Sequence, residues 1–342
     1  MRRFSKIWVL VIGLLMSVCA AYAQDLHFSQ FFNSPLTENP ANTGFIPDAD
    51  CRIGGVIRNQ WSSILASPYK TFSLSGDAQV LRNHFENGWL GLGGVILSDV
   101  AGSGGLRSTK IYGSVAYHQM LGKSSLLSAG FNLGWANKHI DFSKLSFPDQ
   151  FDGTFFDHGL PTSVSLNSSS ISYFDMQVGV NYAYFPDENT YLHFGYSIYH
   201  VNRPAETFFS SNSDSSLIPI RHIVFADAIL KVNDKVIINP NAFFTTQAKA
   251  TEFMLGLTAN YNLSAAGEKQ LIVGVYDRIG DAIVPMVGFE LNHIRFTFSY
   301  DVTNSSLSNY NNSQGASELS ILKKGFYNDY NGNQRQSLCP QF

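Results

Sequence analysis

Charged residues are scarce in this sequence, which has 342 residues of which only 14% are Asp, Glu, Lys or Arg. Soluble domains carry about 25%. Residues 1–23 hold three of the 23 basic residues and none of the 26 acidic ones, so the rest of the chain has 20 basic against 26 acidic residues, a net charge of −6. No basic patch capable of neutralising phosphates stands out, and we therefore expect no nucleic-acid partner.

Long apolar runs are absent after residue 24, and a single short one precedes it. Basic residues at positions 2, 3 and 6 come before the apolar run 7–18, and Ala21-Tyr22-Ala23 follows it. This order is typical of a cleaved signal peptide, which we assign to residues 1–23. A membrane-spanning helix needs about 18 or more apolar residues, and this run is too short. An exported chain without such helices can cross a membrane only as a closed barrel, because lipid leaves the edges of an open sheet unpaired.

Patterns that build metal or catalytic sites are also missing. The nine histidines form no His/Cys spacing that is typical of a metal site. Asp149, Asp152 and Asp157 have the oxygen ligands that a hard cation prefers, but an ordinary solvated loop is the expected arrangement. We expect no cofactor, no catalytic residue and no enzymatic activity. A serine, a histidine and an acid that come together only in the folded chain stay an open alternative.

Cysteine is rare, with two residues beyond the predicted signal peptide, Cys51 and Cys339. Export makes a disulfide permissible. A barrel places its first strand beside its last, so both residues are expected on the same side of the membrane. We predict a disulfide between them, and two free thiols are the alternative.

Alternation with a period of two is the strongest pattern that is present. In residues 71–80, 174–184 and 294–301, apolar residues alternate with polar or small ones. Each stretch is long enough, at about 9 to 11 residues, to cross a bilayer at a tilt. The phase of the last stretch predicts that Phe296 faces lipid and that Thr297 faces the lumen, where we expect a larger side chain to be tolerated.

About fourteen such segments follow one another, and they predict an all-β fold, a transmembrane antiparallel β-barrel over residues 51–323. Short connections, expected in the periplasm, alternate with longer ones expected at the surface, although two of the latter are short. The longest connections are 139–169, 202–218 and 303–314. A soluble β-sandwich is the alternative, but its strands average about 5 or 6 residues. The predicted strands cover residues 51–60, 69–80, 88–98, 105–120, 124–138, 170–186, 190–201, 219–231, 235–246, 250–263, 268–278, 281–291, 293–302 and 315–323.

Two segments flank the predicted barrel. Residues 24–50 are expected to form an N-terminal periplasmic or plug segment, ordered in or under the barrel. Phe28, Phe31 and Phe32 support this expectation, because a free tail would be polar and poor in aromatic residues. Residues 324–342 are polar and are expected to form a periplasmic C-terminal tail.

Several short motifs occur in a defined order along the chain. After the predicted cleavage site it reads Gln24-Asp25-Leu26-His27-Phe28-Ser29-Gln30-Phe31-Phe32, then Pro35, Asn39-Pro40-Ala41 and Gly44. Later motifs are Arg58-Asn59-Gln60-Trp61, Phe147-Pro148-Asp149-Gln150, residues 315–321 and Cys339-Pro340-Gln341-Phe342. In this order they resemble the PorP/SprF family of type IX secretion membrane proteins from end to end. The family often has Pro in place of Leu26 and Arg in place of Gln341, and neither departure affects the fold.

The resemblance implies an outer-membrane component of type IX secretion that helps to secrete, or to attach to the surface, large proteins such as gliding adhesins by binding their C-terminal domain. The implied partners are outer-membrane lipid, the cargo's C-terminal domain and periplasmic components of the system. A passive porin-like channel and an outer-membrane hydrolase are the alternatives. The motif residues implied to serve structure or partner contact are His27, Phe28, Ser29, Gln30, Phe31, Pro35, Asn39, Pro40, Gly44, Arg58, Asn59, Gln60, Trp61, Asp149 and Gln150.

Overall fold

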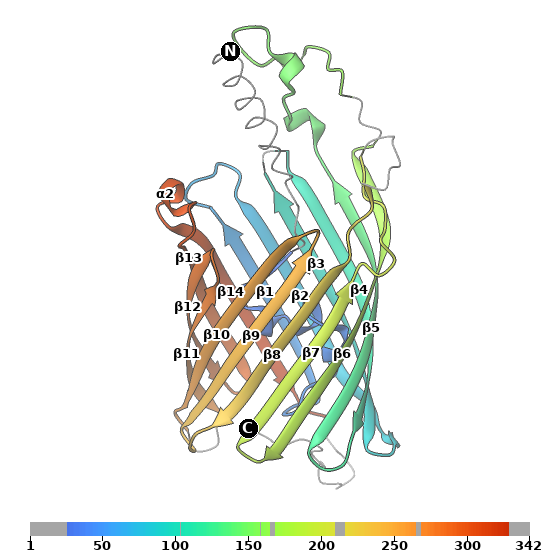
Figure 1. Ribbon diagram of the computed structural model, residues 1–342, viewed down its shortest axis with the longest axis vertical. Helices are drawn as coiled ribbons and strands as arrows, with labels where there is room; N and C mark the ends of the chain where they lie inside the picture. The colour runs from blue at the N-terminus through green and yellow to red at the C-terminus, as the bar shows by residue number, and fades with distance from the viewer. Residues whose placement is uncertain are drawn as a thin grey trace, which may run out of the picture.

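Fourteen antiparallel strands form one closed barrel, in which each strand pairs with its neighbours in the chain and β1 pairs with β14 (Figure 1). The computed structural model describes residues 26–102, 104–157, 159–164, 168–208, 216–264 and 268–327. Within these ranges, no helix is long and apolar enough to span a membrane. The strands are β1 Cys51–Gln60, β2 Tyr69–Phe85, β3 Gly88–Ala101, β4 Leu106–Met120, β5 Ser125–His139, β6 Ser170–Asp187, β7 Thr190–Tyr199, β8 Arg221–Lys231, β9 Val236–Gln247, β10 Ala250–Asn262, β11 Lys269–Arg278, β12 Ala282–Leu291, β13 Ile294–Thr303 and β14 Gln314–Gly325.

The alternation along each strand separates an inner from an outer face. On β13, Thr297 and Ser299 are each 1% exposed, whereas Phe298 between them is 46% exposed. An apolar outer wall around a polar interior is the pattern of a membrane barrel. The predicted fold is therefore confirmed. The strand ends differ slightly, because β2 continues to Phe85 and β14 to Gly325, beyond the predicted ends at 80 and 323.

The two ends of the barrel differ in their connections. At one end, the short-turn end, β2–β3, β6–β7 and β12–β13 are each joined by two residues. Asn292 and His293 have φ values of 49° and 66°, the left-handed conformation of the tight turns that match the twist of a hairpin. At the other end, the long-loop end, lie the long connections β5–β6, β7–β8 and β13–β14 (Figure 1).

Residues 26–50, the plug segment, lie inside the barrel and appear in blue behind the strands in Figure 1. They form three 3₁₀-helices, η1 Phe31–Asn33, η2 Pro35–Thr37 and η3 Pro40–Asn42. Pro35 and Pro40 are the first residues of their helices, where the missing N–H leaves no hydrogen bond unmade. The segment starts in the long-loop half of the lumen and runs to the short-turn end, where β1 begins.

The hydrophobic core lies between the plug segment and the inner wall. Three buried clusters are present, and each contains side chains from both. Phe31 packs 5.0 Å from Phe243 between ring centroids, Phe45 joins a cluster with Trp89, and Phe28 joins one with Val56 and Tyr112. Burial of these rings stabilises the segment by about 1.5–3 kcal/mol each. The plug segment and the inner wall thus form one hydrophobic core inside the barrel.

Candidate functional site

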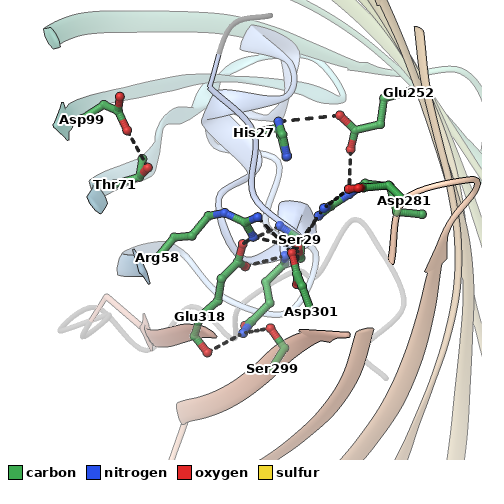
Figure 2. Close-up of polar contacts among 12 residues, drawn as sticks. His27, Ser29, Arg58, Thr71, Asp99, Glu252, Asp281, Ser299, Asp301 and Glu318 are labelled. Atoms are coloured by element: carbon green, nitrogen blue, oxygen red, sulfur yellow. Dashed lines mark hydrogen bonds and ion pairs between the residues drawn. The ribbon is translucent and has the colours of Figure 1, made fainter. Parts of the chain in front are cut away.

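The opening motif and the Arg58 motif meet in the long-loop half of the lumen (Figure 2). The guanidinium of Arg58 donates to Asp301 Oδ2 at 2.9 Å and also to Glu318 Oε1. The backbone amides of Ser29 and Gln30 donate to the two oxygens of the Glu318 carboxylate at 2.7 and 2.9 Å. One carboxylate on β14 therefore binds both the plug segment and a cation on β1.

A second cation completes this network. Arg278, the last residue of β11, lies 3.2 Å from Asp301 Oδ2 and 3.3 Å from Glu252 Oε1, and it also donates to Ser29 Oγ. Two arginines are thus buried among three carboxylates. Burial removes water from a charged group, and a partner of opposite charge offsets that cost. Removing one partner of such a pair typically lowers the stability of the fold by about 3–5 kcal/mol.

His27 lies at the edge of this network, with Nδ1 3.7 Å from Glu252 Oε2. A quarter of its side chain is accessible, at 26%, although it lies within the lumen. Desolvation, followed by the charges of Arg278 and Arg58, lowers the pKa of His27 well below its usual value. His27 is therefore neutral at physiological pH and contacts Glu252 without forming a full ion pair.

Asn39 and Pro40 form a tight turn that docks onto β6 and β7. Asn39 Oδ1 accepts from the Ala41 amide at 2.8 Å, and Asn39 Nδ2 donates to Asn181 Oδ1 at 2.7 Å. Gly179 of β6 faces this turn, and a Cβ at that position would lie 1.9 Å from Asn39 Oδ1. Glycine on the wall makes room for the backbone of the plug segment.

Gly44 occupies the close approach between the plug segment and β3. Its φ is +69°, and an added Cβ would lie 2.4 Å from the Cα of Gly91. Its amide donates to Asp77 Oδ2 at 2.6 Å, and its carbonyl accepts from Trp89 Nε1 at 3.0 Å. Both the backbone conformation and the lack of space require glycine at this position.

Not all of the motif residues reach this site. Asn59 and Gln60 are half-buried at the end of β1, and Trp61 begins the following turn with its amide bonded to the Gly315 carbonyl and its ring edge-on to Tyr69. Within the part of the chain that the structure describes, Asn59 Oδ1 is buried with no hydrogen-bond partner. These three residues belong to the rim at the long-loop end.

Asp149 and Gln150 lie far from the lumen, in the β5–β6 loop that projects beyond the barrel (Figure 1). Asp149 Oδ2 accepts from the Ser163 amide at 2.6 Å, and Gln150 Nε2 donates to the Leu160 carbonyl at 2.9 Å. The two side chains therefore connect the two arms of the loop. Hydrogen bonds from Ser163 lower the pKa of Asp149, which is fully exposed and ionised.

Sequence reasoning did not single out Glu252, Arg278, Asp301 and Glu318. The sequence did contain an indication of them. The chain has few charges, and these four stand at inward-facing positions of strands whose other inward residues are small and polar. Glu318 also falls within the 315–321 motif. Their partners, however, come from strands that are far apart in sequence, and alternation does not specify which strands meet across a lumen.

The alternative chemistries find little support in the described residues. Asp149, Asp152 and Asp157 accept hydrogen bonds from separate turns, and no three His, Cys, Asp or Glu side chains in the described ranges gather as metal ligands. His118 Nδ1 lies 2.7 Å from Ser128 Oγ, but its Nε2 bonds to the carbonyl of Thr43 and not to an acid. A serine–histidine–acid triad needs that third group.

The thiol of Cys51 is free in the described residues, and its predicted partner Cys339 lies outside them. The predicted signal peptide, residues 1–23, also lies outside, as does most of the predicted tail, residues 328–342. The disulfide stays a prediction. Cys51 does open the first strand at the short-turn end, beside Gly325 of β14.

Comparison with known proteins decides the family. The profile described as type IX secretion system membrane protein PorP/SprF matches residues 20–322. The chain belongs to the PorP/SprF family. The resemblance seen in its motifs is thereby confirmed, and family and fold together support a location in the outer membrane. Membership implies interaction with other components of type IX secretion and with its cargo.

Several solved structures share the fold at low identity. They include the Ralstonia pickettii toluene transporter TbuX, with 12% identity, a TM-score of 0.52 and coverage of 86% of this chain and 94% of that chain. The P. putida toluene transporter TodX has 13% identity, a TM-score of 0.51 and coverage of 86% and 95%. The monoaromatic hydrocarbon channel CymD has 10% identity, a TM-score of 0.50 and coverage of 86% and 93%. No curated protein matches the chain. The family and these structures are secretion or channel barrels, and the likeness to the latter concerns the fold alone.

Proposed function

We propose that this PorP/SprF protein is a plugged outer-membrane barrel that assists type IX secretion by holding the C-terminal domain of a large cargo protein at its long-loop end. The observation that carries the proposal is the plug segment. A barrel whose lumenal side chains are hydrogen-bonded to its own N-terminal segment is suited to present loops to another protein. A porin, in contrast, keeps its interior filled with water.

The binding surface that we propose is the tip of the β5–β6 loop. Phe151, Phe155 and Phe156 are 48%, 71% and 56% exposed there. The rings of Phe151 and Phe156 pair at 5.2 Å, and the Asp149 and Gln150 bonds hold the loop beneath them. Exposed aromatic side chains on a structured support are typical of protein-binding sites, because little conformational entropy is lost on binding.

Co-purification from native membranes tests this function. The double variant Phe155→Ser/Phe156→Ser should lose the bound cargo while its thermal unfolding stays that of the wild type. The matched control is Tyr310→Ser, which removes a ring that is 85% exposed on helix α2 Ser308–Asn311 at the same end. Undiminished cargo on the double variant would contradict this docking surface, and a wild-type protein free of cargo would contradict the function.

A passive channel is the second candidate, and a lumenal cavity of about 230 Å³ on the short-turn side favours it. Planar-bilayer recording separates the two functions. The plugged barrel should show no stable open-channel current, and a large steady conductance of the intact protein would favour the channel.

A further inference from the structure

The wall of the barrel is interrupted between β8 and β9, on the near side in Figure 1. The two strands pair at Asp227–Asn241 and, in the same register, at Leu230–Ile238, but these fully described strands form no pair at the two positions between. The unpaired positions hold Ala228 and Ile229 on β8 and Asn239 and Pro240 on β9. All four residues stay paired with their other neighbour, β7 or β10. The two strands therefore separate locally while each remains in the sheet.

Pro240 accounts for this interruption. Proline has no N–H for a ladder bond, and within sheets it is normally confined to edge strands and bulges. A backbone group without a partner is tolerated at membrane depth only where protein covers it or where it lines a water-filled cavity. A gap in the wall at Pro240 therefore requires a cavity behind it.

Such a cavity lies in the lumen against the plug segment. This lumenal cavity has a volume of about 230 Å³, and Ala228, Ile229 and Asn239 of the gap line it. Tyr191 and Arg295 on its wall are each the second residue of a strand that begins at the short-turn end. The network around Ser29 is at the opposite end of the lumen, so the cavity is a separate site.

A larger hollow, the outer groove, lies over the same gap on the outside of the barrel. Its volume is about 680 Å³. Its floor consists of small outward-facing residues, Ala226, Ala228, Pro240 and Ala242. Its sides consist of large residues that are 39–51% exposed, Tyr182, Tyr184, Leu192, Phe194 and Leu255. Val232, beyond the end of β8, is still apolar and 60% exposed, so the groove lies within the apolar band of the wall.

The outer groove and the lumenal cavity meet at the gap. Four residues line both of them, namely His193, Asp227, Ala228 and Asn241. Ala228 has the outward phase of β8 and yet borders the lumenal cavity, whereas Asp227 has the inward phase and borders the groove. Two hollows that share these residues, at the place where the ladder is open, indicate a side opening through the wall.

We propose that this side opening admits the acyl chain of an outer-membrane lipid, which passes between β8 and β9 and packs in the lumenal cavity. The outer groove faces the hydrocarbon of the bilayer, where acyl chains are the available occupant. Inside, the chain contacts Phe31, Phe32 and Phe45 of the plug segment and Ile272 and Met286 of the wall. Each CH₂ group buried there contributes about 0.8 kcal/mol. The role is additional to cargo binding and does not depend on it.

The charged groups of the lumenal cavity are compatible with a hydrocarbon chain. Arg52 and Arg295 are each paired with a carboxylate at 2.8 Å, and Asp227 is hydrogen-bonded to His193 at 2.9 Å. Burial raises the pKa of Glu38 to about 8, so this acid is mainly uncharged at neutral pH. An acyl chain can therefore enter without separating an ion pair.

Photochemical cross-linking of the whole protein in phosphatidylcholine vesicles tests the proposal. The probe is a phosphatidylcholine with a diazirine near the end of one acyl chain, and adducts are mapped by peptide mass spectrometry. The outer wall should be labelled in any case, whereas adducts on Phe31, Phe32 and Phe45 are expected only if a chain enters the cavity. Phe28 is the internal reference, because it is buried in the plug segment within another cluster and does not line the cavity.

Two variants close the side opening by different means. Ala226→Phe/Ala228→Phe fills the outer groove, and its control Ala129→Phe adds the same ring at an exposed position of β5. Pro240→Ala restores an N–H to the ladder, and its control is Pro285→Ala, since Pro285 lies where the β12–β13 ladder is interrupted but lines neither hollow. Both closing variants should lower labelling of the plug segment at least about tenfold, which corresponds to losing roughly two buried CH₂ groups. The controls should match the wild type.

Three results would overturn the proposal. The first is a wild-type protein whose plug segment carries no adduct. The second is labelling of Phe28 as strong as that of Phe45, because the probe would then reach the segment by another route. The third is undiminished labelling of the plug segment in both closing variants when their heat-dependent gel mobility shows that they are folded.

Discussion

Replacing Arg58 with alanine should release the plug segment. In the plugged state Arg58 is a buried partner of both Asp301 and Glu318, and its loss leaves their charge less compensated. Asp301 keeps Arg278, and Glu318 keeps the amides of Ser29 and Gln30. We therefore expect a penalty at the low end of the usual range, about 3 kcal/mol. Water hydrates the carboxylates once the segment leaves, so the penalty falls mainly on the plugged state.

Chymotrypsin measures this release, because the plug segment contains phenylalanines that are buried while it is docked. A shift of about 3 kcal/mol raises the open fraction, and with it the rate of cleavage in residues 26–50, by about 100-fold. Mass spectrometry of the fragments separates these cuts from cuts in the loops. Arg107→Ala, which removes an exposed arginine from β4, is the matched control. Equal cleavage of Arg58→Ala, Arg107→Ala and the wild type would refute the argument.

Three further predictions concern the backbone, the outer wall and a buried acid. Gly44→Ala should destabilise docking by at least about 1–2 kcal/mol, seen as faster cleavage, because its φ is +69°; unchanged cleavage would contradict this. Phe298→Arg, on the outer wall, should cost about 2–4 kcal/mol in refolding into bilayers, whereas Tyr310→Arg should cost little; equal costs would show that the facing of β13 is wrong. Burial raises the pKa of Glu38 from 4.5 to about 8, so docking should weaken as pH rises from 4.5 to 8 and level off above it. Glu38→Gln should abolish this slope in cleavage rate, and a slope that persists would assign it to another group.

The barrel itself was predictable because each strand carries its own evidence. Alternation and strand length are local properties, and a membrane barrel needs nothing more to define its inner and outer faces. Phe296 and Thr297 do lie on opposite faces of β13. The aromatic residues of the opening motif also indicated an ordered N-terminal segment.

The contents of the lumen could not be predicted in the same way. From its lumenal phase Thr297 is expected to tolerate a larger side chain; in the fold its hydroxyl donates to Gln30 Oε1 at 2.6 Å, so a larger side chain there would compete with the plug segment for space. The Thr297–Gln30 contact joins residues 267 positions apart, and a single sequence offers no pairing rule for such a contact. The same limit hid Glu252 and Arg278.

The position of Ser29 has a consequence for how the chain assembles. Ser29 contacts Arg58 on the first strand and Glu318 on the last, so it spans the line along which the cylinder closes. An assembly intermediate in which β1 and β14 are still apart has only half of this binding site for the N-terminal segment. Closure of the cylinder and docking of the segment therefore stabilise each other, because the N-terminal segment binds both of the strands that pair last, β1 and β14.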